Sequence, residues 1–237
     1  MTSRDWSSDV CSSDLGIAGP RFEKPEEVVE WMGAMQAQDI RAAKWAVGLR
    51  IASPSLTAVQ EALDTGRILR LHVMRPTWHY IPGRDIKWMT GLSTKGLLSK
   101  FRFYAKHFSL TEEDFLRSKP QIEEVLSGQH LTSQEVLEQL HSKGIALDEP
   151  IVKMYLSFGE ADGTVCSGIE KNGKHTYALT CERIPDAIEL SHEEALAELT
   201  RRYFRSHGPA TLEDFVWWSA LNIGEARNAI ASLGTEM

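Results

Sequence analysis

The chain has 237 residues, of which 42% are hydrophobic and 25% charged, and its formal net charge is −7. This length and composition are typical of a soluble globular protein of one large or two to three small domains. The sequence has no apolar run long enough to span a bilayer. The acidic net charge argues against a generally basic nucleic-acid binder. The cysteines, Cys11, Cys166 and Cys181, are widely spaced without a Cys-x-x-Cys pair, which indicates neither a disulfide framework nor a zinc site and favours a reducing cytoplasm.

The N-terminal segment, residues 1–15, differs from the rest of the chain. A Ser-Ser-Asp triplet at residues 7–9 recurs at residues 12–14, without apolar periodicity. The segment also lacks the basic start and apolar run of a signal peptide. We therefore predict that residues 1–15 are non-native or disordered, similar to a translated sequencing scar, and that native residues ahead of Gly16 are missing.

Residues 16–83 form the first predicted unit, in which three short helices precede a β-hairpin. The first helix is expected to begin at Pro25, which suits a first turn, and to end near residues 36–39. The other expected elements are helices over residues 41–49 and 55–63 and strands over residues 68–73 and 77–81. This is the element order of a winged helix, in which one helix or the wing meets DNA.

Gln36 and Gln38 stand at the predicted end of the first helix, with Ala37 between them. Inside a helix their side chains would point about 200° apart, but where the chain leaves α geometry both amides could face one cleft. A carboxamide has no proton to give up at neutral pH, so it positions a water or a base and is a poor general base itself. The alternative interpretation is that both side chains cap the helix.

The predicted hairpin carries arginines and one histidine. Arg67, Arg70 and Arg75 are placed to contact phosphates, and the alternative is that they are surface arginines of an edge strand. His79 lies on the second strand, where an imidazole that exchanges protons near neutrality would suit a hydrolytic site. A lone histidine in a strand is more often a structural residue with satisfied hydrogen bonds, which is the alternative interpretation.

Residues 84–110 are predicted to form a helical connector. The stretch over residues 84–106 holds six basic residues against Asp85 alone. Such an excess either contacts phosphates or forms a solvated helix face. The six residues are Arg84, Lys87, Lys95, Lys100, Arg102 and Lys106.

A second predicted winged helix spans residues 111–190. Its wing is expected around residues 168–174, between two short β-rich runs. Lys171 and Lys174 at the tip either touch a DNA backbone or serve solubility alone.

A third winged helix, over residues 191–237, is predicted to be truncated, one hairpin short of completion. The apolar face of Phe215, Trp217 and Trp218 is then expected to be partly unsupported. Trp217 and Trp218 are either a stacking pair or part of the core.

Three segments together resemble the bacterial tandem winged-helix DNA-binding family that includes the alkylpurine and interstrand cross-link DNA glycosylases. They cover residues 35–50, 75–81 and 207–218, and the resemblance extends from about Phe22 to the end of the chain. In the glycosylase branch, a Gln-hydrophobic-Gln motif positions the water that attacks the sugar carbon, and residues 36–38 match it residue by residue. The resemblance also implies that a Thr-x-His segment, which includes His79, lies close to the glutamines.

The sequence thus predicts a mainly α protein with small β-hairpins, built from tandem winged helices that bind DNA. As a glycosylase it would hydrolyse the N-glycosidic bond of alkylated purines or unhook interstrand cross-links. Gln36 and Gln38 would orient the water, and Asp39 or another carboxylate would offset the positive charge on the sugar. Arg41 joins the residues expected to contact DNA.

The expected partner is double-stranded DNA, including alkylated or cross-linked DNA, and the expected state is a cytoplasmic monomer without a membrane segment, metal or cofactor. One alternative is a non-catalytic winged-helix DNA-binding protein or transcriptional regulator, and another is a protein–protein interaction module, which the acidic charge would suit. The sequence contains no Gly-rich phosphate loop, HExxH motif or nucleophile elbow, so it gives no support to an NTPase, a zinc hydrolase or a serine hydrolase.

Overall fold

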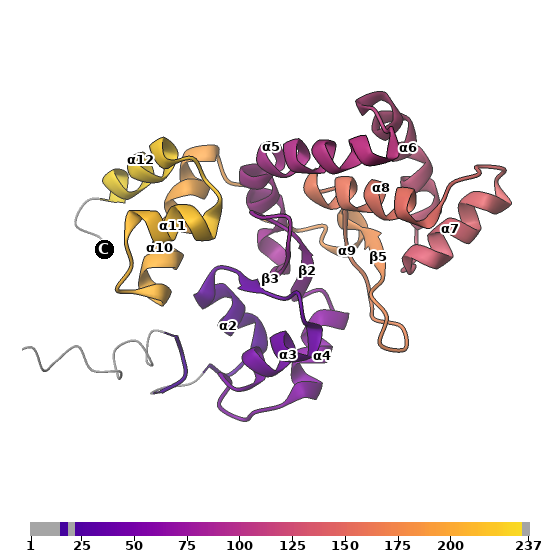
Figure 1. Ribbon diagram of the computed structural model, residues 1–237. Coiled ribbons are helices and arrows are strands. Elements are labelled where there is room, and N and C mark those ends of the chain that lie inside the picture. The colour runs from indigo at the N-terminus through magenta and orange to yellow at the C-terminus, as the bar shows by residue number, and fades with distance from the viewer. Residues whose placement is uncertain (1–14, 19–21, 234–237) are drawn as a thin grey trace, which may run out of the picture.

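The computed structural model describes residues 15–18 and 22–233, so residues 1–14 of the segment predicted to be non-native lie outside the described residues. The chain folds into helices around two small antiparallel sheets (Figure 1). The helices are α2 (Pro25–Met32), α3 (Ile40–Gly48), α4 (Leu56–Asp64), α5 (Ile86–Ala105), α6 (Glu112–Leu126), α7 (Ser133–Ser142), α8 (Glu149–Ala161), α9 (Thr180–Arg183), α10 (His192–His207), α11 (Leu212–Ser219) and α12 (Ile223–Leu233), with 3-10 turns η1 (Gly83–Asp85) and η2 (Lys106–Phe108). The strands are β1 (Met35–Gln36), β2 (Ile68–His72), β3 (Trp78–Pro82), β4 (Val165–Ser167) and β5 (Tyr177–Leu179).

The first helix ends earlier than predicted. α2 stops at Met32, because Gly33 adopts a φ of 73° and donates its N–H to the Glu30 carbonyl at 3.2 Å. A positive φ is accessible to glycine without steric strain and commonly terminates a helix. The chain then becomes extended and forms β1, a strand that the helical pattern did not predict.

β1 joins the predicted hairpin as its third strand. The sheet has the order β1-β3-β2, and both pairings are antiparallel. In the register, Gln36 of β1 lies opposite His79 of β3, and Leu71 of β2 lies opposite the same histidine. The hairpin therefore brings the histidine and the first glutamine of the motif to neighbouring positions.

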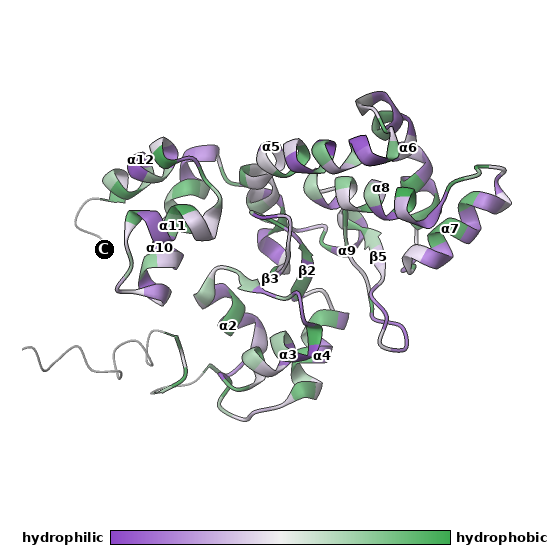
Figure 2. Ribbon diagram, in the orientation of Figure 1, coloured by the Kyte–Doolittle hydropathy of each residue, from purple (hydrophilic) through white to green (hydrophobic). Residues whose placement is uncertain are grey.

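Three clusters of buried side chains stabilise the fold. One lies among α2, α3, α4 and the three-stranded sheet, and a second lies among α5 to α8 and the β4–β5 pair. The third joins the β2–β3 hairpin and the start of α5 to α10, α11 and α12. The long helices carry hydrophobic residues beside hydrophilic ones (Figure 2). The third cluster contains residues from both the N-terminal and the C-terminal part of the chain, so it joins the two parts.

The aromatic residues of α11 are not left as one unsupported face. Phe215 is fully buried and Trp218 is 9% exposed, so core packing is the correct interpretation for these two. Trp217, in contrast, is 72% exposed. The expectation of an unsupported apolar face is therefore wrong for Phe215 and Trp218.

A buried ion pair ties α10 to the start of α5. Arg202 donates from Nη1 to Asp85 at 2.5 Å and from Nε to Glu198 at 2.7 Å, and the side chains of Arg202 and Asp85 are 5% and 1% exposed. The guanidinium also lies over the ring of Trp88 at 5.3 Å. Asp85, the lone acid of the basic stretch, is thus matched by a cation 117 residues further along the chain.

A second polar contact joins β2 to α8. The carboxylate of Glu160 is fully buried and bonds to Nδ1 of His72 at 2.5 Å, while burial raises the pKa of Glu160 above its ordinary value.

His175, which follows the predicted wing, lies between Trp78 and Tyr177 at ring-centroid distances of 4.6 Å. Burial lowers the pKa of His175 to about 3, so this side chain is an interior residue.

Within the described part of the chain, no helix is long and apolar enough to cross a bilayer.

Candidate functional site

The two glutamines lie in the segment that joins β1 to the bend just before α3, not at the end of α2. Gln36 closes β1, and Ala37 continues the pairing by donating its N–H to the Trp78 carbonyl at 2.7 Å. Gln36 and Gln38 are both exposed, while Ala37 between them is fully buried. Both amides therefore reach the surface, on either side of a buried alanine.

The backbone of this segment is fixed by Arg70. Its Nε donates to the Ala37 carbonyl at 2.9 Å and its Nη2 to the Gln38 carbonyl at 3.4 Å. Arg70 is only 8% exposed, and its guanidinium lies over the ring of Trp78 at 4.1 Å. It is therefore not the surface arginine of the alternative interpretation, and the predicted contact with phosphates stays a prediction. Its planar guanidinium instead donates to two consecutive carbonyls of the segment that carries the amides.

Further bonds hold the second glutamine and the residue after it. The N–H of Trp78 donates to Oε1 of Gln38 at 3.3 Å. Oδ1 of Asp39 accepts from the N–H groups of Arg41 and Ala42 at 2.9 and 3.0 Å, so Asp39 is the N-cap of α3. A carboxylate at this position is stabilised by the unpaired N–H groups and the positive end of the helix. A fixed anion thus stands next to the amides.

His79 lies opposite Gln36 in the sheet but, unlike that glutamine, it is buried. It is 1% exposed, and Nδ1 is 2.8 Å from the Thr77 carbonyl, which fits a neutral ring that donates from Nδ1. Among the described residues, Nε2 has no hydrogen-bond partner although it is buried. Burial, followed by the charge of Arg75, lowers the pKa of His79 to about 4. The imidazole is therefore uncharged near neutrality and has a free acceptor.

Acidification is expected to destabilise the protein through His79. The pKa falls from 6.5 to about 4 on folding, so the unfolded chain binds more protons between these values, and stability present above pH 6.5 is lost as pH falls. One such group contributes a slope of about 1.4 kcal/mol per pH unit. Denaturation curves measured from pH 7 to 4 give the free energy of unfolding at each pH. In His79→Asn this free energy should depend less steeply on pH, by the contribution of one bound proton. The exposed His107→Asn is the control, and an unchanged slope in His79→Asn would contradict the shift.

The turn of the hairpin contacts the C-terminal part of the chain. The guanidinium of Arg75 lies over the ring of Trp217 at 4.7 Å. Burial lowers the pKa of Arg75 from its ordinary value. Neither residue was linked to the other by the sequence patterns, because they are far apart in the chain and no local motif joins them.

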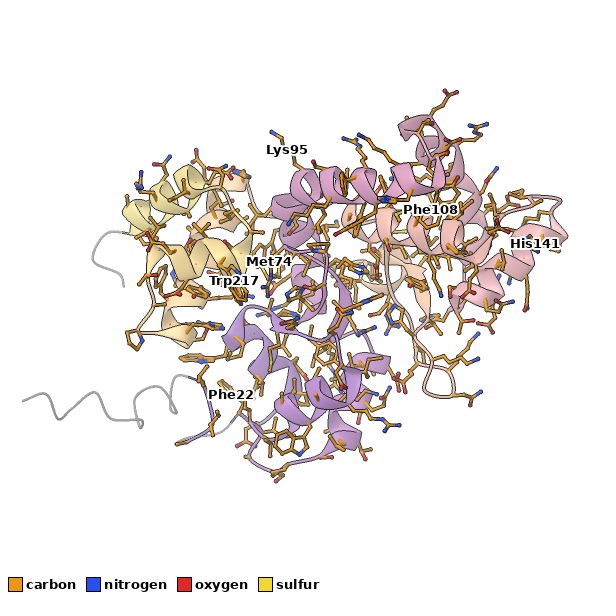
Figure 3. All side chains as sticks on the ribbon, viewed as in Figure 1. Phe22, Met74, Lys95, Phe108, His141 and Trp217 are labelled. Atoms are coloured by element: carbon orange, nitrogen blue, oxygen red, sulfur yellow. The ribbon has the colours of Figure 1, made fainter. Side chains whose placement is uncertain are left out.

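The other cationic candidates are dispersed. Around an α-helix, Lys95, Arg102 and Lys106 fall within about 40° of one another, whereas Lys100 lies about 140° from Lys95. Lys95 projects from α5 on the side away from the hairpin turn (Figure 3). Three of these four residues thus share one side of the helix, and Lys95 among them points away from the hairpin that carries His79 (Figure 3).

Several cations have acidic neighbours. Arg67 pairs with Glu26 at 3.4 Å and with Glu61 at 3.1 Å, and Lys171 pairs with Glu135 at 3.0 Å. The backbones of Lys171 and Lys174 pair with each other at the tip of the β4–β5 loop. Arg84 and Lys87 also form ion pairs, with Glu30 at 2.5 Å and with Glu189 at 2.7 Å.

Metal-binding side chains do not gather in the described part of the chain: no group of three or more His, Cys, Asp or Glu residues there could hold an ion. Cys166 is buried and Cys181 is exposed, and both are free thiols. Burial raises the pKa of Cys166 to about 12, so this thiol is not a nucleophile at neutral pH.

Known proteins share both the sequence and the fold. A family model described as "DNA glycosylase AlkZ-like" matches residues 29–236. The interstrand DNA cross-link repair glycosylase of Streptomyces sahachiroi is 23% identical over 204 residues, which cover 83% of this chain and 55% of that protein. The solved structure of the Streptomyces sahachiroi DNA glycosylase AlkZ aligns with a TM-score of 0.76 at 20% identity, covering 95% of this chain and 64% of that one.

The chain spans about half the length of the curated relative and under two thirds of the solved one. The structural likeness, at its low identity, establishes the fold. The family model covers most of the sequence, including the two glutamines and the hairpin that supports them. The chain therefore belongs to the AlkZ-like DNA glycosylase family.

Proposed function

We propose that this chain binds duplex DNA and hydrolyses the N-glycosidic bond of alkylated purines, including those in interstrand cross-links. The observation that carries the proposal is the pair of exposed amides, Gln36 and Gln38, on either side of buried Ala37 in a segment whose backbone Arg70 holds. Preorganised dipoles of this kind can orient a water molecule without rearranging during the reaction. Family membership, and relatives named as DNA glycosylases, support the same reaction class.

The reaction needs little acid assistance. A purine alkylated at N7 or N3 is cationic, so it leaves as a neutral base when the bond from its N9 to C1′ breaks and takes the electron pair. The amides of Gln36 and Gln38 hold the water whose oxygen bonds to C1′, and its proton is released to solvent. Asp39, fixed at the N-cap of α3, offsets the positive charge that develops on the sugar.

His79 acts in this scheme as a positioning residue. It lies opposite Gln36 in the sheet and is neutral, with Nε2 left as an acceptor. Opposed residues of an antiparallel pair share one face. The imidazole therefore lies on the same side of the sheet as the first amide, and its burial keeps it out of direct contact with the sugar.

We further propose that residues 16–83, 111–190 and 191–237 belong to successive winged helices, and that residues 84–110 connect the first two. The order of elements supports this: α2, α3 and α4 precede β2 and β3, and α6, α7 and α8 precede β4 and β5. The same scheme assigns contacts with the DNA backbone to exposed cations on several elements. These are Arg41, Arg67, Lys95, Lys100, Arg102, Lys106, Lys171 and Lys174.

A base-release assay tests the proposed function. The purified chain is incubated with a labelled duplex containing 7-methylguanine, and abasic sites are counted after alkaline cleavage. Release above the rate without protein is expected. Salt-dependent duplex binding without release would instead favour a non-catalytic regulator, and no duplex binding at low salt would favour a protein–protein interaction module.

Arg70→Met is expected to lower the excision rate about tenfold or more, because the carbonyls of Ala37 and Gln38 lose their donor and the segment beneath the amides loosens. The matched control is Arg183→Met, since Arg183 also holds two consecutive carbonyls, those of Leu63 and Asp64, at 2.7 and 3.1 Å. Both variants should lower the melting temperature. Only Arg70→Met should lower the single-turnover rate, and equal rates in the two variants would refute the positioning role.

A further inference from the structure

The surface tryptophan of α11 has no role in the fold or in the mechanism above. Trp217 is 72% exposed, more than any other large hydrophobic side chain in the described part of the protein. Its helix neighbours Phe215 and Trp218 face the core instead. An indole is enriched at interfaces because it offers a large flat contact surface at low entropic cost. Its exposure in an otherwise well-packed helix marks it as a contact residue.

Arg75 fixes the orientation of this ring. The guanidinium carbon lies 4.7 Å from the centroid of Trp217, which is cation–π geometry. Since the side chain remains largely exposed, this contact covers only part of the ring. Arg75 itself belongs to the turn between β2 and β3, so the hairpin that supports the two glutamines also supports the indole.

Two further observations bring α11 to the glutamine segment. A Cβ placed on Gly33, just ahead of β1, would lie 3.4 Å from the ring of Trp218, so the residue next to Trp217 packs on the backbone that leads to Gln36. On the hairpin side, Trp217 lies against Arg75 of the turn between β2 and β3. The exposed indole and the exposed amides are thus carried by elements in direct contact.

We propose that Trp217 stacks on a nucleobase of the DNA bound at the Gln36–Gln38 segment. This inference rests on the proposed function. A purine or pyrimidine ring offers a flat face whatever its sequence, and stacking on an aromatic side chain needs no hydrogen-bond code. The cation behind the indole adds attraction for the nearby phosphate backbone. The C-terminal helices then supply a DNA-contacting residue to a site whose amides come from the N-terminal part of the chain.

The test compares Trp217→Ala and Trp217→Phe with a matched control. Trp31 of α2 lies under the guanidinium of Arg205 of α10 at the same 4.7 Å, so Trp31→Phe changes an equivalent contact elsewhere in the protein. The first readout is the affinity for a fluorescein-labelled duplex containing 7-methylguanine, measured by anisotropy. The second is the quenching of tryptophan fluorescence when unlabelled duplex of the same sequence is added.

Trp217→Ala should weaken duplex binding at least fivefold, Trp217→Phe should retain most of the affinity, and both should lose part of the quenching. Trp31→Phe should keep both the affinity and the quenching. Wild-type affinity and undiminished quenching in Trp217→Ala would overturn the stacking proposal. The same holds if the Trp217 and Trp31 variants lose thermal stability alike without a difference in DNA binding. Failure of the wild-type chain to bind duplex would overturn the proposed function itself, which is a distinguishable result.

Discussion

Replacing Gln36 and Gln38 together by alanine is expected to abolish excision of 7-methylguanine from a labelled duplex. Both side chains are exposed, so their removal leaves no cavity and should leave the melting temperature nearly unchanged. The backbone contacts of Arg70 are retained, because they involve carbonyl groups. The groups lost are the dipoles that orient the water, together with the acceptor of the exposed bond from the Trp78 N–H to Gln38. The loss of such dipoles lowers rates by about 10²-fold or more.

Single-turnover kinetics at saturating protein separate this effect from a loss of binding. Gln134→Ala on α7, another exposed glutamine, is the matched control and should excise at the wild-type rate. Gln36→Ala and Gln38→Ala should each show an intermediate rate. If the double variant releases base as fast as the wild-type chain, the two amides do not position the water and the mechanism is wrong.

Arg202→Met should produce the largest loss of stability, about 3–5 kcal/mol, because it leaves Asp85 as an uncompensated buried anion. One oxygen of Asp85 already has no hydrogen-bond partner in the described part of the chain, so no other group can replace the guanidinium. Glu198 loses its bond to Arg202 as well. Urea denaturation followed by circular dichroism at pH 7 measures the effect.

Two controls show whether the buried charge is the cause. Adding Asp85→Asn to Arg202→Met removes the anion and should recover a large part of the lost free energy of unfolding. Lys153→Met, which breaks an exposed pair with Glu149 on α8, should change the stability by less than about 1 kcal/mol. A loss in Arg202→Met as small as that in Lys153→Met would show that this contact does not stabilise the docking of α10.

Many of the helices can be predicted from short-range patterns in the sequence. Ser55 caps α4, and Thr111, Thr132, Ser191 and Thr211 form capping boxes at later helices. Each box needs only residues three apart, so a pattern search finds it. The strand β1 was missed because its residues continue the apolar pattern of α2, and its pairing with β3 depends on residues more than forty positions away. Gly33 was the available signal for the helix end.

The candidate site was predictable in its residue types but not in its geometry. The spacing of Gln36 and Gln38 pointed to a shared face only if the chain is extended there, which the helical assignment concealed. Arg70 had the appearance of a strand-surface residue, because nothing in its neighbourhood reveals that its guanidinium reaches two carbonyls. The contact between Arg75 and Trp217 lay beyond any local pattern, since it depends on how α11 docks.

The cluster shared by the hairpin and the C-terminal helices has a consequence for synthesis on the ribosome. Leu71 and Ile81 of the hairpin pack in the same core as Phe215 and Ala226. Until α12 has left the exit tunnel, the hairpin lacks these neighbours and presents apolar surface to chaperones. The segment with Gln36 and Gln38 is translated early, but its final packing requires α10, α11 and α12. A nascent chain stalled before α10 would therefore carry the motif without its final geometry.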